Sequence, residues 1–300
     1  MKRAAIVACL IVNMGAARAA SAQSPSGGAA STHPAPAVQD DDAVLDPVEP
    51  DFVVVNLPTA LPLPVLKGNF RLTHRFAGNL RRGTFGQQLS NLFGLDQGAI
   101  IGFEYRIAVA RHVQAAFYRS SFDKTIQFHG KYDAIRQRGS MPVSISALAS
   151  IEGTDNFHQK YAPAVGAVVS RRVGTRVAAY LTPIWADNTA ASLDAIVHDH
   201  GEHSASDDDA PHPRHSTTFI GVGGRVRVGG STYLAVEIVP RVAGYSPDRP
   251  AYGISVEKRA GGHMFSLTFT NTFGTTFAQV ARGGAANTLY LGFNLARKFY

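Results

Sequence analysis

The feature that most constrains the fold of this chain is a series of segments, each about ten residues long, in which apolar and polar side chains alternate. In the clearest of them, KTIQFHGKYDA at residues 124–134, Ile126, Phe128 and Tyr132 alternate with polar residues. Strict alternation indicates a β-strand with one apolar and one polar face. A tilted strand that crosses a membrane needs about 9–11 residues, whereas strands of globular proteins are most often about 5–6 residues long.

Twelve such segments follow one another between residue 69 and the C-terminal end. They span residues 69–77, 99–108, 112–121, 124–134, 142–151, 160–171, 175–185, 217–228, 231–242, 251–258, 262–272 and 287–299. The odd-numbered connections are mostly long and the even-numbered ones mostly short, although the third is short and the fourth is of medium length. Up-and-down barrels of outer membranes show this asymmetry, with short periplasmic turns and long outer loops.

Hydrocarbon offers no hydrogen-bond partner to the backbone, so only helices or closed barrels can cross a membrane. After residue 22 the chain has no run of 18 apolar residues. We therefore predict an all-β fold, an up-and-down antiparallel transmembrane β-barrel of about 12 strands. A soluble periplasmic β-sheet binding protein, such as a β-sandwich or a lipocalin-like fold, is the alternative.

The N-terminus, MKRAAIVACLIVNMGAARAASAQ, combines a basic start, a short apolar run and small residues before a cleavage site. This pattern is typical of a secretory signal peptide. We expect residues 1–22 to be the signal peptide, 23–50 a disordered leader rich in Ala, Pro and Asp, and 51–300 the barrel domain. Sec-type export to the outer membrane of a Gram-negative bacterium follows from this organisation, and Cys9, the single cysteine, would leave with the signal.

The net charge of the whole chain is +7, of which Lys2, Arg3 and Arg18 supply three in the predicted signal, so +4 remains after it. So mild a charge does not indicate binding to nucleic acid.

Several short motifs resemble a bacterial β-barrel family known as domain of unknown function 5777. They are Asn-Leu-Pro-Thr-Ala at 56–60, Leu-Lys-Gly at 66–68, Thr-His-Arg-Phe at 73–76 and Leu-Phe-Gly-Leu-Asp at 92–96. The likeness covers residues 55–137; the LPLPVLKG segment is longer than the family's usual form. The resemblance implies a β-barrel in the outer membrane and no known activity. The lipid-facing phase of Phe299 near the C-terminus is typical of the signal read by the barrel-assembly machinery, which with the lipid bilayer is an expected partner.

Charged residues on the polar phase of the strands form the main candidate site, a lumen charge cluster. Its members are Arg71, Arg75, Glu104, Arg106, His129, Lys131, Asp133, Glu237 and Arg241. Facing inward, these side chains either line a pore and set its selectivity or pair into a network that fills the barrel. A barrel of eight strands is filled by side chains and one of 16–18 leaves a channel, so about twelve strands decide neither reading.

The longest connection, 186–216, contains a histidine-rich stretch. Its candidate metal ligands are His198, His200, His203, His212 and His215. Imidazole suits zinc, copper or nickel, but no rigid element holds these side chains, and we favour a solvated outer loop, or weak metal capture without a structural site. The loop at 84–93 is a further candidate for a short amphipathic helix, lying either in the barrel mouth or at the membrane interface.

The preferred function is a porin-like barrel for a small polar solute, or a structural barrel, without a cofactor or a catalytic residue. An outer-membrane lipid-modifying enzyme is a further hypothesis. His74 and His129 would be its candidates, but no Ser-His-acid spacing or Gly-x-Ser-x-Gly motif supports it. His74 falls on the apolar face, where packing between aromatic rings is the expected role.

Overall fold

The computed structural model describes residues 48–189 and 216–299, all within one compact unit, Asp40–Tyr300. The strands are β1 (Gly68–Asn79), β2 (Ala99–Ala110), β3 (Val113–Ser120), β4 (Ile126–Ile135), β5 (Ser144–Thr154), β6 (Gln159–Val173), β7 (Val177–Ala186), β8 (Thr217–Gly229), β9 (Thr232–Val239), β10 (Arg241–Gly244), β11 (Ala251–Ala260), β12 (His263–Thr270) and β13 (Tyr290–Phe299). Short helices lie in the connections: α1 (Phe85–Ser90), η3 (Leu92–Gln97), η4 (Phe122–Lys124) and α3 (Phe277–Arg282). None of the helices within these described ranges is long and apolar enough to cross a membrane.

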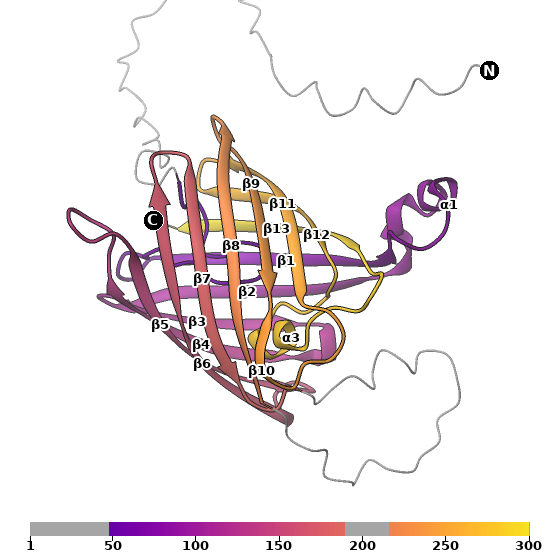
Figure 1. Ribbon diagram of the computed structural model, residues 1–300, viewed down its shortest axis with the longest axis horizontal. Helices are drawn as coiled ribbons and strands as arrows, with labels where there is room; N and C mark the ends of the chain where they lie inside the picture. The colour runs from indigo at the N-terminus through magenta and orange to yellow at the C-terminus, as the bar shows by residue number, and fades with distance from the viewer. Residues whose placement is uncertain (1–47, 190–215, 300) are drawn as a thin grey trace, which may run out of the picture. The chain divides into compact units, whose positions relative to one another are not determined.

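The strands form one antiparallel sheet that closes on itself (Figure 1). β9 and the first residue of β10 pair with β8 in one register, since Ile238 lies opposite Val222 and Arg241 lies opposite Phe219; the register shifts between Arg241 and Ala243. β9 and β10 are two parts of one strand, interrupted where Pro240 lacks the amide hydrogen that the ladder needs. In the described part of the chain, the thirteen assigned segments therefore make a closed barrel of twelve strands, as predicted.

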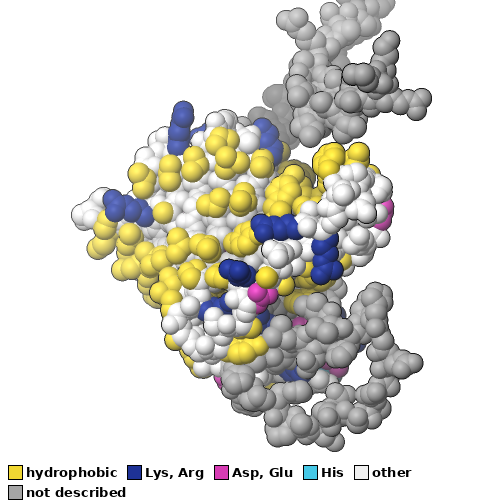
Figure 2. All heavy atoms as spheres, turned by 45° about the vertical axis from the view of Figure 1, so that its right-hand side comes forward, with side chains coloured by type: hydrophobic (Ala, Val, Ile, Leu, Met, Phe, Trp, Pro, Cys, Tyr) yellow, Lys and Arg dark blue, Asp and Glu magenta, His cyan; other side chains and the backbone are white. Residues whose placement is uncertain are grey.

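The two faces of the wall differ as the alternation requires. Outward side chains such as Phe128, Val236 and Leu267 are 47%, 50% and 47% exposed, and Figure 2 shows hydrophobic side chains spread over the outer surface. Inward side chains are buried, and many of them are polar or charged; apolar ones such as Val168, Ile184 and Phe219 form clusters among them. A closed sheet with an apolar exterior does not fit the soluble β-sandwich that was the alternative.

One end of the barrel, which we call the turn end, carries the short connections and the start of β1. The other, the loop end, carries the long ones, including α1, η3 and α3. The short third connection also lies at the loop end, where it forms η4.

The lumen is occupied from both ends. Residues 48–61, which we call the strap, precede β1 and are all buried. Their first three, Val48, Glu49 and Pro50, fell within the expected leader, so the packed structure includes the end of that segment. From the loop end, the connection between β12 and β13 folds inward, and every residue of α3 is buried.

A charge placed on the outer wall tests its contact with lipid. Leu267→Arg, at the middle of β12, is expected to reduce the free energy of unfolding by about 2–4 kcal/mol, whereas Val228→Arg, near the end of β8, is expected to cost about 0–1 kcal/mol. Urea unfolding in lipid vesicles measures both. Equal costs at the two positions would contradict a membrane-spanning wall.

Candidate functional site: the filled lumen

Eight of the nine residues predicted to form the lumen charge cluster are buried in the structure; they are Arg71, Arg75, Glu104, Arg106, His129, Lys131, Asp133 and Glu237. The ninth, Arg241, is partly exposed at the loop end, where it donates to the carbonyl oxygens of Arg282 and Asp248. The eight make two kinds of contact, with the strap and with one another across the wall, as in the ion pair of Lys131 with Asp133 at 3.3 Å.

Glu237, on β9, holds the turn of the strap. The strap folds back on itself because the amide of Val54 donates to the carbonyl of Leu57 and the amide of Thr59 donates to Phe52, both at 2.8 Å. This turn directs the next amides outward. The amides of Val55, Asn56 and Leu57 all donate to the Glu237 carboxylate, at 2.9–3.0 Å. A carboxylate that accepts several backbone hydrogen bonds is a strong anchor because each bond is charge-assisted.

Cations of the wall bind the carbonyl oxygens of the strap. Lys131 donates to Thr59 at 3.1 Å and to Leu61 at 2.6 Å, and Lys298 donates to Pro50 at 2.6 Å. Phe52 lies between two charges, with the Arg106 guanidinium and the Lys298 ammonium each 5.3 Å from its ring centre. The wall therefore satisfies both donors and acceptors of a segment that forms no sheet of its own.

Asn56 joins the strap to β1 and β13. Arg75 donates to its side-chain oxygen at 3.1 Å and to the side chain of Asn294 at 2.8 Å. Asn294 in turn donates to the carbonyl of Val55 at 3.3 Å.

An ion pair that sequence reasoning missed lies beside the strap. Arg225 binds both carboxylate oxygens of Glu257, at 2.7 and 3.1 Å, and donates to the carbonyl of Val53 at 2.7 Å. Both side chains are fully buried. Alternation could have found them, because Arg225 and Glu257 stand on the polar phase of their segments just as Glu237 does.

A second group of charges lies on the wall of β1, β2 and β4. Glu104 accepts from Arg71 at 3.2 Å and from Arg106 at 3.0 Å. Both ring nitrogens of His129 and further N–H groups of Arg71 and Arg106 have no hydrogen-bond partner among the described residues. This part of the lumen retains a hydrogen-bonding capacity that its own pairs do not use.

Glu152, on β5, holds the segment inserted from the loop end. Its carboxylate accepts from the Thr276 hydroxyl at 2.8 Å and from the amide of Ala278 at 3.2 Å. These groups belong to the start of α3, where free amides and the helix dipole favour an anion. The last residue of α3, Arg282, lies 3.3 Å from Asp123 of η4. Both inserted segments are thus anchored by a wall carboxylate that binds backbone amides.

Removing the Glu152 anchor is expected to loosen α3. In Glu152→Ala, the amide of Ala278 loses its acceptor and should exchange its hydrogen faster, while amides in the middle of β12 keep their protection. Hydrogen exchange read by mass spectrometry measures both regions. Unchanged exchange in α3 would mean that other contacts hold the segment.

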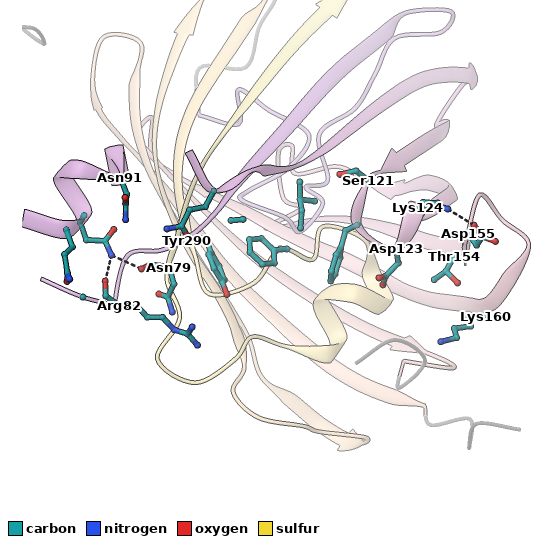
Figure 3. A pocket seen from close by; sticks show the side chains of 18 of the residues that line it. Asn79, Arg82, Asn91, Ser121, Asp123, Lys124, Thr154, Asp155, Lys160 and Tyr290 are labelled. Carbon is teal, nitrogen blue, oxygen red and sulfur yellow. Dashed lines mark hydrogen bonds and ion pairs between the residues drawn. The ribbon is translucent and has the colours of Figure 1, made fainter. Parts of the chain in front are cut away.

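A cavity of about 1220 Å³ opens at the loop end (Figure 3). Its lining includes amide side chains of the first loop, Gln87, Gln88 and Asn91, and the aromatic residues Phe273 and Tyr290, whose ring centres are 4.0 Å apart. We call this cavity the vestibule.

The remaining candidates lie apart from the lumen. His74 is on the outer face, where its ring stacks on Phe293 at 4.8 Å and lies 4.4 Å from Phe76; His74 and His129 are thus on opposite faces of the wall. The histidines proposed as metal ligands, at positions 198 to 215, fall outside the described residues.

Comparison with known proteins identifies the family of this chain. A family model described as "Membrane bound beta barrel domain (DUF5777)" matches residues 53–299, which confirms the resemblance seen in the motifs. Among solved structures, the chain is similar to the NanC porin, with a TM-score of 0.46, 6% identity and coverage of 78% of this chain and 99% of that one. It is also similar to the outer membrane protein Omp33 of Acinetobacter baumannii, with a TM-score of 0.40, 8% identity and coverage of 78% and 98%. No curated protein matches the chain.

Proposed function

We propose that this chain, which belongs to the family of membrane-bound β-barrel domains, is an outer-membrane barrel for gated passage of a small polar solute. In the resting state the strap and α3 close the lumen from opposite ends. The observation that carries the proposal is the way in which they are held. The wall binds both segments largely through their backbone amides and carbonyls, as the contacts of Glu237, Lys131 and Glu152 illustrate.

Such contacts can be exchanged for water. A hydrogen bond to a charged group contributes a net of about 1.5–3 kcal/mol, far less than its strength in isolation, because water replaces the partner that is lost. When the strap leaves the lumen, the wall presents buried charges to the space that opens. These are the charges of Arg75, Lys131, Arg225, Glu237 and Glu257. A small solute with hydrogen-bonding groups suits this lining better than an apolar one.

A purely structural barrel is the second candidate. The buried Arg225–Glu257 pair and the complete burial of the strap favour it, because they are typical of a permanently packed interior. The two candidates differ in one measurable property, the current that the barrel passes when the strap is free to move.

A removable disulfide tests the gate. A Cβ built on Gly253 lies 3.3 Å from the Cβ of Val55, close to the separation of about 3.5–4.5 Å found in disulfides. In Val55→Cys/Gly253→Cys, we expect the oxidised barrel to show no openings in planar bilayers and the reduced barrel to recover them. The single substitutions are the controls, since neither can form the bond. Currents that do not depend on reduction in the double variant would contradict gating by the strap.

A further inference from the structure

The first loop of the loop end carries an apolar surface that no described residue covers. In α1 and η3 the side chains of Phe85, Leu89, Leu92, Phe93 and Leu95 are 75%, 42%, 52%, 37% and 42% exposed. So concentrated a group of large apolar side chains at a protein surface marks contact with a membrane or with another protein. We call this group the apolar loop face.

The loop is amphipathic, and its two faces point in different directions. Phe85 and Leu89 have the i, i+4 spacing of one helical face of α1, and Leu92 follows just after the C-cap Asn91. Gln87, Gln88 and Asn91 take the other side and line the vestibule, whereas none of the five apolar residues does. The polar side therefore faces the barrel mouth and the apolar side faces away from it. The barrel wall is arranged in the same way, with polar side chains inward and an apolar surface outward.

The orientation of the loop is set by its own packing. A capping box fixes the start of α1, in which the amide of Thr84 donates to Gln87 at 2.8 Å. Gln88 donates to the carbonyl of Asn79 at the end of β1, at 2.9 Å. Gly94, with φ of +88°, packs its backbone against Gly78, where a Cβ on either residue would collide with the other.

The apolar loop face continues an established interface. It follows directly on the wall of β1 and β2, where Ile101 and Phe103 are 44% and 42% exposed on the lipid side. Figure 1 shows α1 projecting from the end of these two strands. An amphipathic element with its apolar side outward next to a lipid-facing wall is suited to lie at the boundary of headgroups and acyl chains.

We propose that the α1–η3 loop docks on the membrane lipid around the loop end. Phe85, Leu89 and Leu92 enter the acyl region, while the amides of Gln87, Gln88 and Asn91 remain over the vestibule. The loop then anchors one rim of the barrel mouth, independently of whether the lumen opens.

Tryptophan fluorescence of the full-length protein in phosphatidylcholine vesicles tests this docking. The chain has one tryptophan, Trp185, so Trp185→Phe provides a silent background. Into it we place Phe85→Trp on the apolar loop face, with Leu89→Trp as its duplicate, and Asn91→Trp as the control on the vestibule side. Heat-modifiable migration in gels confirms that each variant is folded before it is measured.

The expected result is a several-fold loss of Phe85→Trp emission in vesicles made with acyl-brominated phosphatidylcholine, and little quenching by acrylamide in the water. Asn91→Trp should show the reverse. Quenching of Phe85→Trp by acrylamide to the extent seen for Asn91→Trp would overturn the proposal, since the loop would stand in water. Protection of Phe85→Trp and Leu89→Trp from both quenchers would also overturn it, because the face would then be covered by protein, such as a second copy of the chain.

Discussion

A chain from which residues 48–61 have been deleted is expected to conduct several-fold more ionic current per barrel than the intact protein. The strap enters the lumen from the turn end and reaches past its middle, where Val55 and Leu57 lie against Gly253 and Gly221. The wall groups that bind it, among them Glu237 and Lys131, would become hydrated when it is absent. A barrel of about twelve strands lies between those filled by side chains and those that leave a channel. Single-channel recording in planar bilayers measures the change.

Two observations accompany this measurement. Heat-modifiable gel migration must show that the deleted chain still forms a barrel, as expected, because the closed ladder from β1 to β13 does not include the strap. A folded barrel with unchanged conductance would mean that the strap does not limit passage.

The largest loss of stability is expected from Arg225→Ala. The substitution leaves Glu257 buried without its partner and removes the donor to the carbonyl of Val53. Breaking a buried ion pair by removing one member costs about 3–5 kcal/mol, chiefly because the remaining charge is uncompensated. Urea unfolding in vesicles should show this decrease in the free energy of unfolding.

The same protein supplies a matched control. Lys124 and Asp155 form an ion pair of 3.3 Å whose side chains are 64% and 48% exposed. Lys124→Ala should cost no more than about 1 kcal/mol, because solvent screens a surface pair. The double variant Arg225→Met/Glu257→Leu should recover most of the loss, since it leaves no buried charge. Equal losses for Arg225→Ala and Lys124→Ala would show that the buried pair has no special role.

The strands could be predicted because their signal is local. Segment 124–134 shows its two faces within a few residues, and the bounds of β4 (Ile126–Ile135) nearly coincide with it. Where a prediction differed in detail, a single residue explains it: segment 231–242 is one strand in register, but Pro240 interrupts its ladder between β9 and β10.

The inward charges were also predictable, but their partners were not. Alternation placed Glu237 on the polar face, and nothing in its neighbourhood indicates that it binds the amide of Asn56, 181 residues away in the sequence. The motif at 56–60 was recognisable as a family resemblance. Five residues do not show, however, that the segment lies inside a barrel. Applied to every segment, the same alternation would have added Arg225 and Glu257.

The amino-acid sequence alone therefore determined the wall of this protein: its strands, their two faces and the asymmetry of its two ends. These follow from side-chain polarity at a period of two residues, which acts along each strand without reference to the others. Only the tertiary structure decided what fills the lumen and where the polar side of the first loop points. Those outcomes depend on backbone groups that find partners across the closed sheet, and the pairing of such groups leaves no periodic trace in the chain.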